Sequence, residues 1–409
     1  MTVTISDIRR AQNRCDDDDV VRVTPIETSR TLDSEVGADV RLKMEHLQRT
    51  GSFKTRGAYN KLTKLTESGT DRTDVIAASA GNHAQGVALA ATKAGLDSTI
   101  VMPKNAPQAK IDATKGYGGT VDLHGKTFRD AMGYAKSIAD DDSVFVHAYD
   151  DPDIVAGQGT LGLEIIEQVP DVDTVIVPIG GGGLIGGIAT AIGERSPETR
   201  IIGVQADGAA TVPESLEAGA PRTRESVQTI ADGIATGGIS DLTYQLITEY
   251  VDDVITVTDT EIAESVLFLL ERTKQMVEGA GAISVAALRS GQLDVEGEVV
   301  VPLLCGGNLS MTDLQTVLTH GLTHRDQLVR LRVQIVDQPG EMNRISEAIG
   351  DHGANISDVS HERSAKDLDV GDAYLQFRIE TSGSDQTERI VESIREMGYD
   401  VRTCGEGEY

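Results

Sequence analysis

The chain of 409 residues is long enough for two or three compact units, and its formal charge of −28 makes it strongly acidic. Because nucleic acids and anionic membranes are bound through basic patches, this charge excludes both as expected partners. No apolar run approaches the ~20 residues of a membrane helix, and the first residues lack the apolar core of a signal peptide. We therefore expect a cytoplasmic protein.

The types of charged residue are also informative. The chain has 25 arginines, 12 lysines, 65 acidic residues and only 3% aromatic residues. This composition resembles that of proteins from salt-loving microbes, and the alternative is an ordinary acidic cytosolic protein. Cys15, Cys305 and Cys404 lie far apart without a CxxC spacing, so we expect neither disulfides nor a metal site. Since the overall field repels anions, an anionic ligand has to be held by local backbone amides.

Short runs rich in valine and isoleucine alternate with helical patterns from Val40 to Leu318. This alternation is typical of repeated βαβ units and a parallel sheet, so we expect an α/β fold. The expected strands are Val40–Met44, Val75–Ala78, Thr99–Met102, Thr120–Leu123, Val144–His147, Thr174–Pro178, Ile201–Val204, Val254–Val257 and Val299–Leu304. The expected helices include Asn82–Ala94, Thr127–Ala139, Ile154–Val169, Leu184–Glu194 and Thr260–Met276.

The pattern changes near His324. After it we expect a strand at Leu331–Ile335, a helix at Glu341–His352, strands at Asn355–Glu362 and Ala373–Glu380, a helix at Gln386–Met397 and a strand at Tyr399–Cys404. This βαββαβ order is the ferredoxin-like arrangement. We place a larger catalytic unit at residues 1–325, with a smaller inserted subdomain at about residues 50–150, and a separate small unit at residues 326–409.

Lys54 lies in the segment TGSFKTRG at residues 50–57, after an expected strand and at the start of an expected helix. Open parallel sheets bind ligands at the carboxyl ends of their strands, which is where this lysine falls. A lysine that attacks a carbonyl group must be partly neutral, and burial or a nearby helix N-terminus lowers its pKa. We interpret Lys54 as a reactive amine; the alternative is a solvated lysine at a helix start.

A second segment, SAGNHA at residues 79–84, also follows an expected strand and opens a helix. Free backbone N–H groups at a helix start form an anion site. With Ser79 and Asn82 adding side-chain donors, a carboxylate fits this turn. The alternative is that Asn82 caps the helix and His83 is a packed or solvent-facing histidine.

The third segment, GGGGL at residues 180–184, lies between an expected strand and an expected helix. Successive glycines let the backbone wrap closely around a phosphate. The spacing of Gly181, Gly183 and Gly186 also matches the dinucleotide fingerprint, but the next strand ends in Gln205 where that fingerprint requires an acidic residue. No Gly-Lys-Ser/Thr follows, which excludes a P-loop, so a phosphate group is the expected occupant.

The fourth segment, CGGN at residues 305–308, closes the last expected strand of the large unit. Its position at a strand's carboxyl end keeps a functional role open for Cys305. The alternative is a core cysteine at a glycine turn, because free cysteine is usually a small buried hydrophobe.

Together the four segments resemble one family, the fold-type II (tryptophan-synthase-like) pyridoxal-phosphate enzymes, and within it the threonine dehydratases. The resemblance covers nearly all of residues 1–325 and implies pyridoxal 5′-phosphate as cofactor, with Lys54 as its covalent anchor and the catalytic base. The implied cofactor contacts are Lys54, Phe53, Asn82, Gly180, Gly181, Gly182, Gly183, Leu184, Cys305, Gly233 and Glu278. The implied substrate contacts are Ser79, Gly81, Asn82 and His83.

The reaction that the resemblance implies removes water and then ammonia from L-threonine to give 2-oxobutanoate, and similarly converts L-serine to pyruvate. Cys305 would face the pyridine nitrogen of the cofactor. A neutral thiol there leaves the ring less electrophilic than a carboxylate would, which favours elimination over transamination. Cys305 could instead be a thiolate, because a following helix start would lower its pKa.

Serine racemases have the same scaffold and nearly the same motifs. They resemble this chain except that a serine base stands at the position of Ala80. Their acidic metal ligands also align with Gln205 and Thr211 here, so dehydration is favoured over racemisation. A serine-preferring dehydratase and a non-catalytic amino-acid sensor remain as further alternatives, although the intact Lys54 argues against the sensor.

Residues 330–404 resemble an ACT domain, a small module that binds amino acids and regulates amino-acid enzymes. The resemblance rests on DQPGEM at residues 337–342 and GANI at residues 353–356. It implies that an amino-acid effector contacts Pro339, Gly340, Asn355 and Ile356. A dehydratase joined to a sensor points to the first step of isoleucine synthesis, with isoleucine or valine as inhibitor. We also expect a homo-oligomer, a dimer or tetramer; the alternative role of this unit is dimerisation alone.

Overall fold

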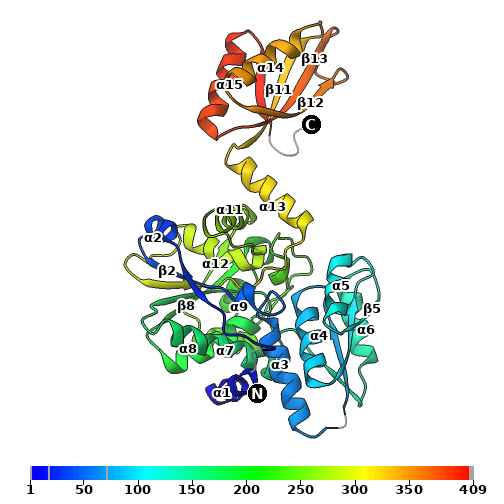
Figure 1. Ribbon diagram of the computed structural model, residues 1–409, viewed down its shortest axis with the longest axis vertical. Helices are drawn as coiled ribbons and strands as arrows, with labels where there is room; N and C mark the ends of the chain where they lie inside the picture. The colour runs from blue at the N-terminus through cyan, green and yellow to red at the C-terminus, as the bar shows by residue number, and fades with distance from the viewer. Residues whose placement is uncertain (1, 17–18, 71, 405–409) are drawn as a thin grey trace. The chain divides into compact units, whose positions relative to one another are not determined.

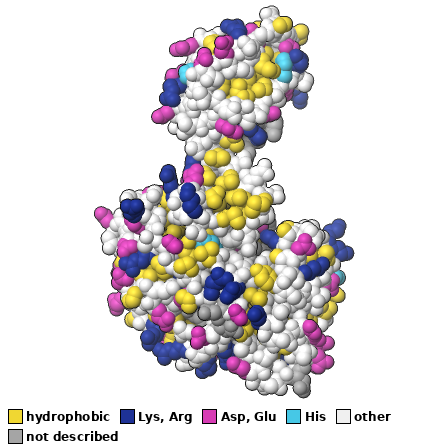
Figure 2. All heavy atoms as spheres, viewed as in Figure 1, with side chains coloured by type: hydrophobic (Ala, Val, Ile, Leu, Met, Phe, Trp, Pro, Cys, Tyr) yellow, Lys and Arg dark blue, Asp and Glu magenta, His cyan; other side chains and the backbone are white. Residues whose placement is uncertain are grey.

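The computed structural model describes residues 2–16, 19–70 and 72–404, and Figure 1 shows its elements in chain order. The chain divides into two compact units, residues 1–314 and residues 315–409. The functional boundary that the sequence places near residue 325 stays a prediction. Within the described residues no helix is long and apolar enough to cross a membrane. Figure 2 shows acidic side chains spread over the visible face of each unit.

The first unit contains a six-stranded sheet in the order β1-β2-β10-β7-β8-β9. Its strands are β1 (Ile26–Thr28), β2 (Asp39–Lys43), β7 (Thr174–Pro178), β8 (Arg200–Ala206), β9 (Asp253–Val257) and β10 (Val299–Pro302). All neighbouring strands pair in parallel except β1 and β2, which are antiparallel. All five residues of β7 are buried, as expected for a central parallel strand with covered faces.

A separate four-stranded parallel sheet lies between β2 and β7 in the chain, in the order β5-β4-β3-β6. Its strands are β3 (Asp74–Ala78), β4 (Asp97–Met102), β5 (Thr120–Leu123) and β6 (Ser143–Phe145). The sheet falls inside the stretch where the sequence predicts an inserted subdomain. The predicted α/β fold with parallel sheets is confirmed.

The helices of this unit pack around the two sheets. They are α1 (Ile5–Cys15), α2 (Arg30–Val36), α3 (Lys54–Glu67), α4 (Asn82–Ala94), α5 (Gln108–Gly116), α6 (Phe128–Ile138), α7 (Pro152–Gln168), α8 (Gly183–Arg195), α9 (Val212–Ala218), α10 (Asp241–Tyr250), α11 (Asp259–Phe268) and α12 (Gly279–Arg289). Short 3₁₀ turns lie at Glu45–Leu47, Asp207–Ala209 and Asp232–Ile234. Glycines allow close approach of α3 and α7, since a Cβ on Gly157 would lie 2.6 Å from the Cα of Gly57.

The helix predicted at Thr260–Met276 is shorter than expected. The α-helix ends at Phe268, a π-helical turn follows at Leu269–Thr273, and Lys274 has a φ of 61°. A left-handed residue ends a helix because it turns the next N–H group out of the helical ladder. The chain is thereby turned toward Glu278, which precedes α12.

The start of α3 is fixed by a buried cluster of ion pairs. Arg56 Nε lies 2.6 Å from Glu45 Oε1, and Arg56 Nη2 lies 2.8 Å from Glu164 Oε2. Lys43 Nζ lies 2.5 Å from Glu164 Oε1, and the Thr24 hydroxyl donates to Glu45. The two cations and two carboxylates balance in charge, which makes their burial tolerable. Because Arg56 is two residues from Lys54, this cluster anchors the first turn of α3.

The second unit contains a four-stranded antiparallel sheet in the order β12-β13-β11-β14. Its elements are α13 (Met311–His324, most of which belongs to this unit), β11 (Leu328–Val336), α14 (Glu341–Asp351), β12 (Asn355–Glu362), β13 (Asp372–Glu380), α15 (Ser384–Glu396) and β14 (Asp400–Cys404). One apolar core joins the strands to α14 and α15, so these helices cover one sheet face. The predicted βαββαβ order is confirmed.

Candidate active site

Lys54 is the first residue of α3, and its side chain is half-buried. Its Nζ donates to the carbonyl oxygen of Ala148 at 3.3 Å and lies 5.0 Å from the centre of the Phe53 ring. Burial lowers the pKa of Lys54 to about 8, while the acidic groups of Cys305 and Glu278 act in the opposite direction. About a tenth of this amine is therefore neutral at pH 7, and a nucleophilic lysine reacts in this neutral form.

The α4 N-terminus carries Asn82, whose amide is held between two neighbours. Asn82 Nδ2 donates to Glu278 Oε1 at 2.7 Å, and its Oδ1 accepts from Asn308 Nδ2 at 2.8 Å. Asn308 Nδ2 also donates to the Thr50 carbonyl at 2.6 Å. Burial raises the pKa of Glu278 above its usual range. The chain of contacts ties the segment before Lys54 to the first residue of α4.

His83 follows Asn82 but points into the packed interior. Its side chain is buried, and Nε2 lies 3.1 Å from the Val146 carbonyl oxygen. Burial and the neighbouring charge of Lys54 lower the pKa of His83 to about 3, so the ring is neutral and donates to Val146. Ser79, half-buried, accepts a hydrogen bond from the Gly81 N–H at 3.1 Å. The predicted contacts of these three residues with substrate stay predictions.

The glycine loop, residues 180–183, lies between β7 and α8. Tyr149 packs against this loop and links it to the Lys54 region. A Cβ on Gly181 would lie 2.2 Å from the Tyr149 ring, and one on Gly183 would lie 2.9 Å from Tyr149 Cβ. Gly182 has a φ of 86°, which strongly favours glycine. Tyr149 follows Ala148, the hydrogen-bond partner of Lys54, so the predicted phosphate loop and the lysine share one neighbouring segment.

Cys305 is buried, and its Sγ donates to the Ala280 carbonyl oxygen at 3.1 Å. Burial raises the pKa of the Cys305 thiol, and the nearby Glu278 adds to the effect. No helix starts directly after Cys305, since α13 begins only at Met311. The alternative that Cys305 is a thiolate required a helix start directly after it, and that helix start is absent. With its raised pKa, Cys305 is a neutral thiol.

Some helices have side-chain caps at their N-termini, and others, among them two that begin at the predicted site motifs, do not. Side chains of Thr4, Thr127, Asp151, Ser240 and Thr258 cap α1, α6, α7, α10 and α11. In contrast, α4 and α8 begin after Gly81 and Gly182 and have no side-chain cap. Their first N–H groups are therefore available to anions, and the positive ends of the helix dipoles add to the attraction.

The model of the "Pyridoxal-phosphate dependent enzyme" family matches residues 18–306, and that of the "ACT domain" matches residues 323–399. The chain belongs to the pyridoxal-phosphate-dependent enzymes. An L-threonine ammonia-lyase of Thermotoga maritima is 43% identical, covering 98% of this chain and all of that protein. A second L-threonine ammonia-lyase, from Geobacter sulfurreducens, is 40% identical over 93% of this chain and 94% of that protein.

Solved structures give the same family. The processed threonine deaminase isoform 2 of Solanum lycopersicum is 34% identical, with a TM-score of 0.73 over 78% of this chain and 90% of that one. Maize serine racemase is 36% identical, with a TM-score of 0.73 over 80% of this chain and 100% of that one. The predicted fold-type II enzyme with a C-terminal ACT domain is confirmed, and pyridoxal phosphate is its cofactor.

The residues of this pyridoxal-phosphate-dependent enzyme fit the cofactor. Lys54 supplies an amine with a lowered pKa, and the uncapped start of α8 supplies backbone donors for a phosphate. Gly233 lies beside the site, since a Cβ on it would lie 3.0 Å from Glu278 Oε1. The roles predicted for Leu184, Cys305, Gly233 and Glu278 toward the cofactor are not tested by these contacts and stay predictions.

Sequence reasoning missed three residues that organise the enzyme's site. Asn308 belongs to the CGGN segment but received no role, although its position at the end of that motif was a usable signal. Tyr149 packs against the glycine loop, and the Thr243 hydroxyl donates to the Gly181 carbonyl at 2.9 Å. No local pattern marks Tyr149 or Thr243, because both reach the loop from distant parts of the chain.

The predicted effector residues of the ACT domain lie on one loop and one strand start. Gly340 precedes α14 with a φ of 103°, and Asn355 begins β12 and donates to Glu380 Oε2 at 3.2 Å. Pro339 is exposed and Ile356 is half-buried. Their contact with an effector stays a prediction.

Proposed function

We propose that this enzyme deaminates L-threonine to 2-oxobutanoate and ammonia, and L-serine to pyruvate. The observation that carries the proposal is the Lys54 amine, half-buried and with a pKa lowered to about 8, at the first residue of α3. The full-length similarity to two L-threonine ammonia-lyases supports the choice of substrate.

When bound, pyridoxal phosphate supplies an electron sink that stabilises negative charge at the substrate Cα. Lys54 would hold the cofactor, and its Nζ would accept the Cα proton of the substrate. The N–H groups at the start of α4, with Ser79 and Asn82, hold the substrate carboxylate. Gly180, Gly181, Gly182, Gly183 and Leu184 hold the phosphate through backbone N–H groups.

Three other side chains complete the proposed cofactor site. Phe53 would pack beside the cofactor ring, and Asn82 would donate to the cofactor. The Cys305 thiol, whose pKa is raised by burial, would be a poor proton donor toward the ring. Gly233 and Glu278 line the site near Asn82.

Serine racemisation is the second candidate, because maize serine racemase is 36% identical. A racemase needs a base on each face of Cα, and Ala80 cannot accept or donate a proton. Chiral chromatography of products from L-serine and L-threonine, together with kcat/KM for each, separates the two activities. The proposal predicts 2-oxo acid with less than a few per cent D-amino acid; accumulation of D-serine as main product would replace it with racemisation.

We place the enzyme in the cytoplasm, at the first step of isoleucine synthesis, as a homodimer or homotetramer. Its acidic composition supports a salt-rich cytoplasm, where activity should rise with salt. L-Isoleucine or L-valine acts at the ACT domain as inhibitor. Initial rates of 2-oxobutanoate release with and without 1 mM L-isoleucine, on the order of the upper range of typical KM values, test the regulation. An unchanged rate with either amino acid would contradict it.

Replacing Gly81 with alanine tests the substrate-carboxylate site. No atom lies within 4 Å of a Cβ built on Gly81, so the free protein has space for the methyl group. We expect kcat/KM for L-threonine to fall by about 10-fold or more, since displacing the carboxylate by 1 Å misaligns the reacting atoms. The melting temperature should stay within about 2 °C of wild type. Gly95→Ala is the control. A Cβ on Gly95 also meets no atom within 4 Å, but its φ of 73° strains alanine, and Gly95 lies far from the site motifs. This variant should lower the melting temperature and leave kcat/KM unchanged.

The pKa of Lys54 predicts a pH dependence in the cofactor-free protein. Burial lowers this pKa from 10.5 to about 8, so the neutral fraction rises as pH passes 8 rather than 10.5. Acetylation of Lys54 by a limiting acylating reagent, followed by peptide mass spectrometry, should show a midpoint near pH 8. A midpoint for Lys54 near its ordinary value of 10.5 would contradict the lowered pKa.

A further inference from the structure

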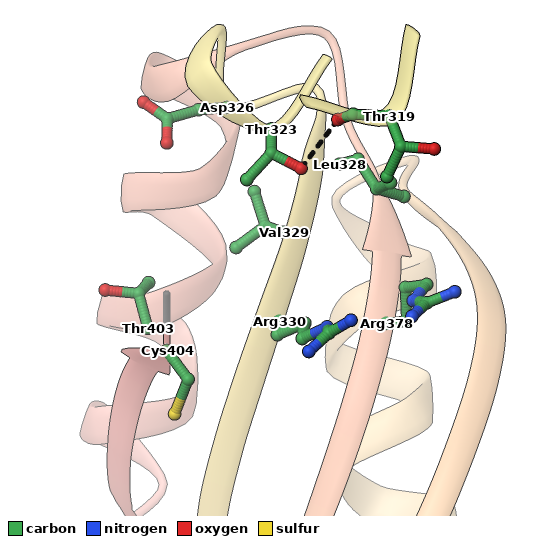
Figure 3. A pocket seen from close by; sticks show the side chains of 9 residues that line it. All are labelled: Thr319, Thr323, Asp326, Leu328, Val329, Arg330, Arg378, Thr403 and Cys404. Carbon is green, nitrogen blue, oxygen red and sulfur yellow. Dashed lines mark hydrogen bonds between the residues drawn. The ribbon is translucent and has the colours of Figure 1, made fainter. Parts of the chain in front are cut away.

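Hydrogen bonds fix polar side chains in both units, but over very different separations along the chain. In the second unit, Thr323 lines a cavity of about 250 Å³, and its hydroxyl donates to the Thr319 carbonyl oxygen at 2.9 Å within α13 (Figure 3). In the first unit, Asn308 contacts Thr50 and Asn82, which lie 258 and 226 residues away in the chain. The contacts of Asn308 therefore join two of the segments that form the predicted active site.

The orientation of the Asn308 amide is fixed by the backbone at Thr50. Asn308 Nδ2 lies 2.6 Å from the Thr50 carbonyl oxygen, which can only accept a hydrogen bond. The nitrogen end of this amide, and not its oxygen end, therefore faces Thr50. Gly51 leaves room for the amide, since a Cβ on Gly51 would lie 2.3 Å from Asn308 Oδ1. The φ of 75° at Gly51 also favours glycine.

Asn308 in turn fixes the amide of Asn82. An amide NH₂ group has two hydrogens, and Asn308 Nδ2 donates its second one to Asn82 Oδ1 at 2.8 Å. At the other end of the Asn82 amide, Nδ2 donates to Glu278 Oε1 at 2.7 Å. If the Asn82 amide turned by 180°, its Nδ2 would face the Nδ2 of Asn308, and its Oδ1 would face the Glu278 oxygen. Both hydrogen bonds would be lost, so one orientation is favoured.

Glycines give these side chains the space to meet. A Cβ on Gly306 would lie 2.3 Å from Glu278 Oε1 and 3.2 Å from Asn82 Nδ2. In the favoured orientation, Glu278 uses one hydrogen of Asn82 Nδ2, and the other hydrogen remains a donor. Asn82 is only half-buried, so a bound molecule can reach this donor.

We propose that Asn308 is a positioning residue that orients the Asn82 amide, so that its nitrogen end and not its oxygen end meets pyridoxal phosphate. The proposal rests on the proposed function in one respect, the contact between Asn82 and the cofactor. Asn308 itself does not have to touch the cofactor. It acts through Asn82, whose amide without this neighbour can present either end.

A double-mutant cycle on the full-length enzyme measures this coupling through the dissociation constant of pyridoxal phosphate. Asn308→Ala and Asn82→Ala should each weaken cofactor binding by about 10-fold or more, since each removes an oriented hydrogen bond. If Asn308 acts through Asn82, the double variant should bind the cofactor within about 3-fold of Asn82→Ala alone. An effect of Asn308 on Lys54 through Thr50 would persist without the Asn82 amide, so a larger further loss in the double variant would contradict the proposal.

Asn308→Asp separates the orienting role from the filling of space. Aspartate has nearly the size of asparagine but no N–H donor, and its oxygens attract the nitrogen end of the Asn82 amide. We expect this variant to weaken cofactor binding at least as much as Asn308→Ala and to shift the visible absorbance maximum of the bound cofactor. Wild-type affinity and absorbance in Asn308→Asp would overturn the proposal.

Asn60→Ala is the matched control. Asn60 is a buried residue of α3 that also donates from Nδ2 to a backbone carbonyl, that of Asp153 at 2.7 Å. Its replacement should lower the melting temperature but change the cofactor dissociation constant less than about 2-fold, because no contact with Asn82 is lost. A loss of cofactor affinity equal to that in Asn308→Ala would assign the effect to general loosening and overturn the proposal.

The same measurements separate this inference from the proposed function. If Asn82→Ala weakens cofactor binding and Asn308→Ala does not, the positioning role of Asn308 is wrong and the contact of Asn82 with the cofactor stands. If Asn82→Ala binds the cofactor as wild type does, the proposed contact fails and the positioning role fails with it. Because cofactor binding is the readout, the result does not depend on which amino acid the enzyme deaminates.

Discussion

Replacing Lys54 with alanine is expected to lower kcat for L-threonine by at least about 10³-fold, since it removes both the cofactor anchor and the base near Cα. The amine lies at the first residue of α3, and burial lowers its pKa to about 8. The measurement is initial 2-oxobutanoate release by protein saturated with pyridoxal phosphate. The visible absorbance of the bound cofactor should change at the same time.

Two further variants show whether activity depends on the positive charge of Lys54 or on its ability to lose a proton. Lys54→Arg keeps the positive charge but cannot lose its proton in the working range, so it should be as inactive as the alanine variant. Lys64→Ala, on the same helix, removes only an ion pair with Asp153 in which the lysine side chain is 51% exposed, and should keep wild-type kcat. More than a tenth of wild-type kcat in Lys54→Ala would contradict the assigned role.

Replacing Glu164 with glutamine is expected to lower the free energy of unfolding by about 3–5 kcal/mol, because it leaves a buried cation without its partner. Glu164 accepts from both Lys43 and Arg56, and all three side chains are largely buried. Burial by itself would raise the pKa of Glu164, but the charges of Arg56 and Lys43 lower it below its usual range. Denaturant unfolding, with the salt concentration held fixed, measures the loss.

Glu67→Gln is the matched control for this prediction. Its partner Arg14 lies 2.7 Å away, but the Glu67 side chain is 51% exposed, so the loss should be at most about 1 kcal/mol. A carboxyl group with a lowered pKa contributes stability above its unfolded pKa, and that contribution is lost as pH falls. The difference between wild type and Glu164→Gln should therefore shrink as pH falls below 4.5. Equal losses of unfolding free energy in Glu164→Gln and Glu67→Gln at neutral pH would contradict the role given to the buried ion-pair cluster.

The parts of the site that the sequence reveals are those formed by short segments. Lys54, Asn82 and the glycines at 180–183 each lie between a strand and a helix, where parallel sheets bind ligands. Alternating apolar runs also predict β7 and α4 with their observed ends, because both lie in the interior of regular βα units. The ferredoxin-like order of the second unit follows from the same local patterns.

Other features depend on contacts between distant segments. Tyr149 contacts glycines 32 and 34 residues away, and Asn308 contacts partners 226 and 258 residues away, which no local pattern encodes. The end of α11 at Phe268 was not predicted, because the apolar spacing continues through the π-helical turn that follows. Strand β1 is only three residues long and pairs antiparallel at the sheet edge, so its sequence has no strong alternation.

The covalent attachment of the cofactor is the central claim and can be measured directly. The holoenzyme is reduced with borohydride, digested, and mapped by mass spectrometry over all 12 lysines of the chain. We predict that the mass of the reduced pyridoxal phosphate is found on the peptide that contains Lys54 and is absent from that position in Lys54→Arg. Attachment at any other lysine, or no attachment in a protein that deaminates L-threonine, would contradict this account.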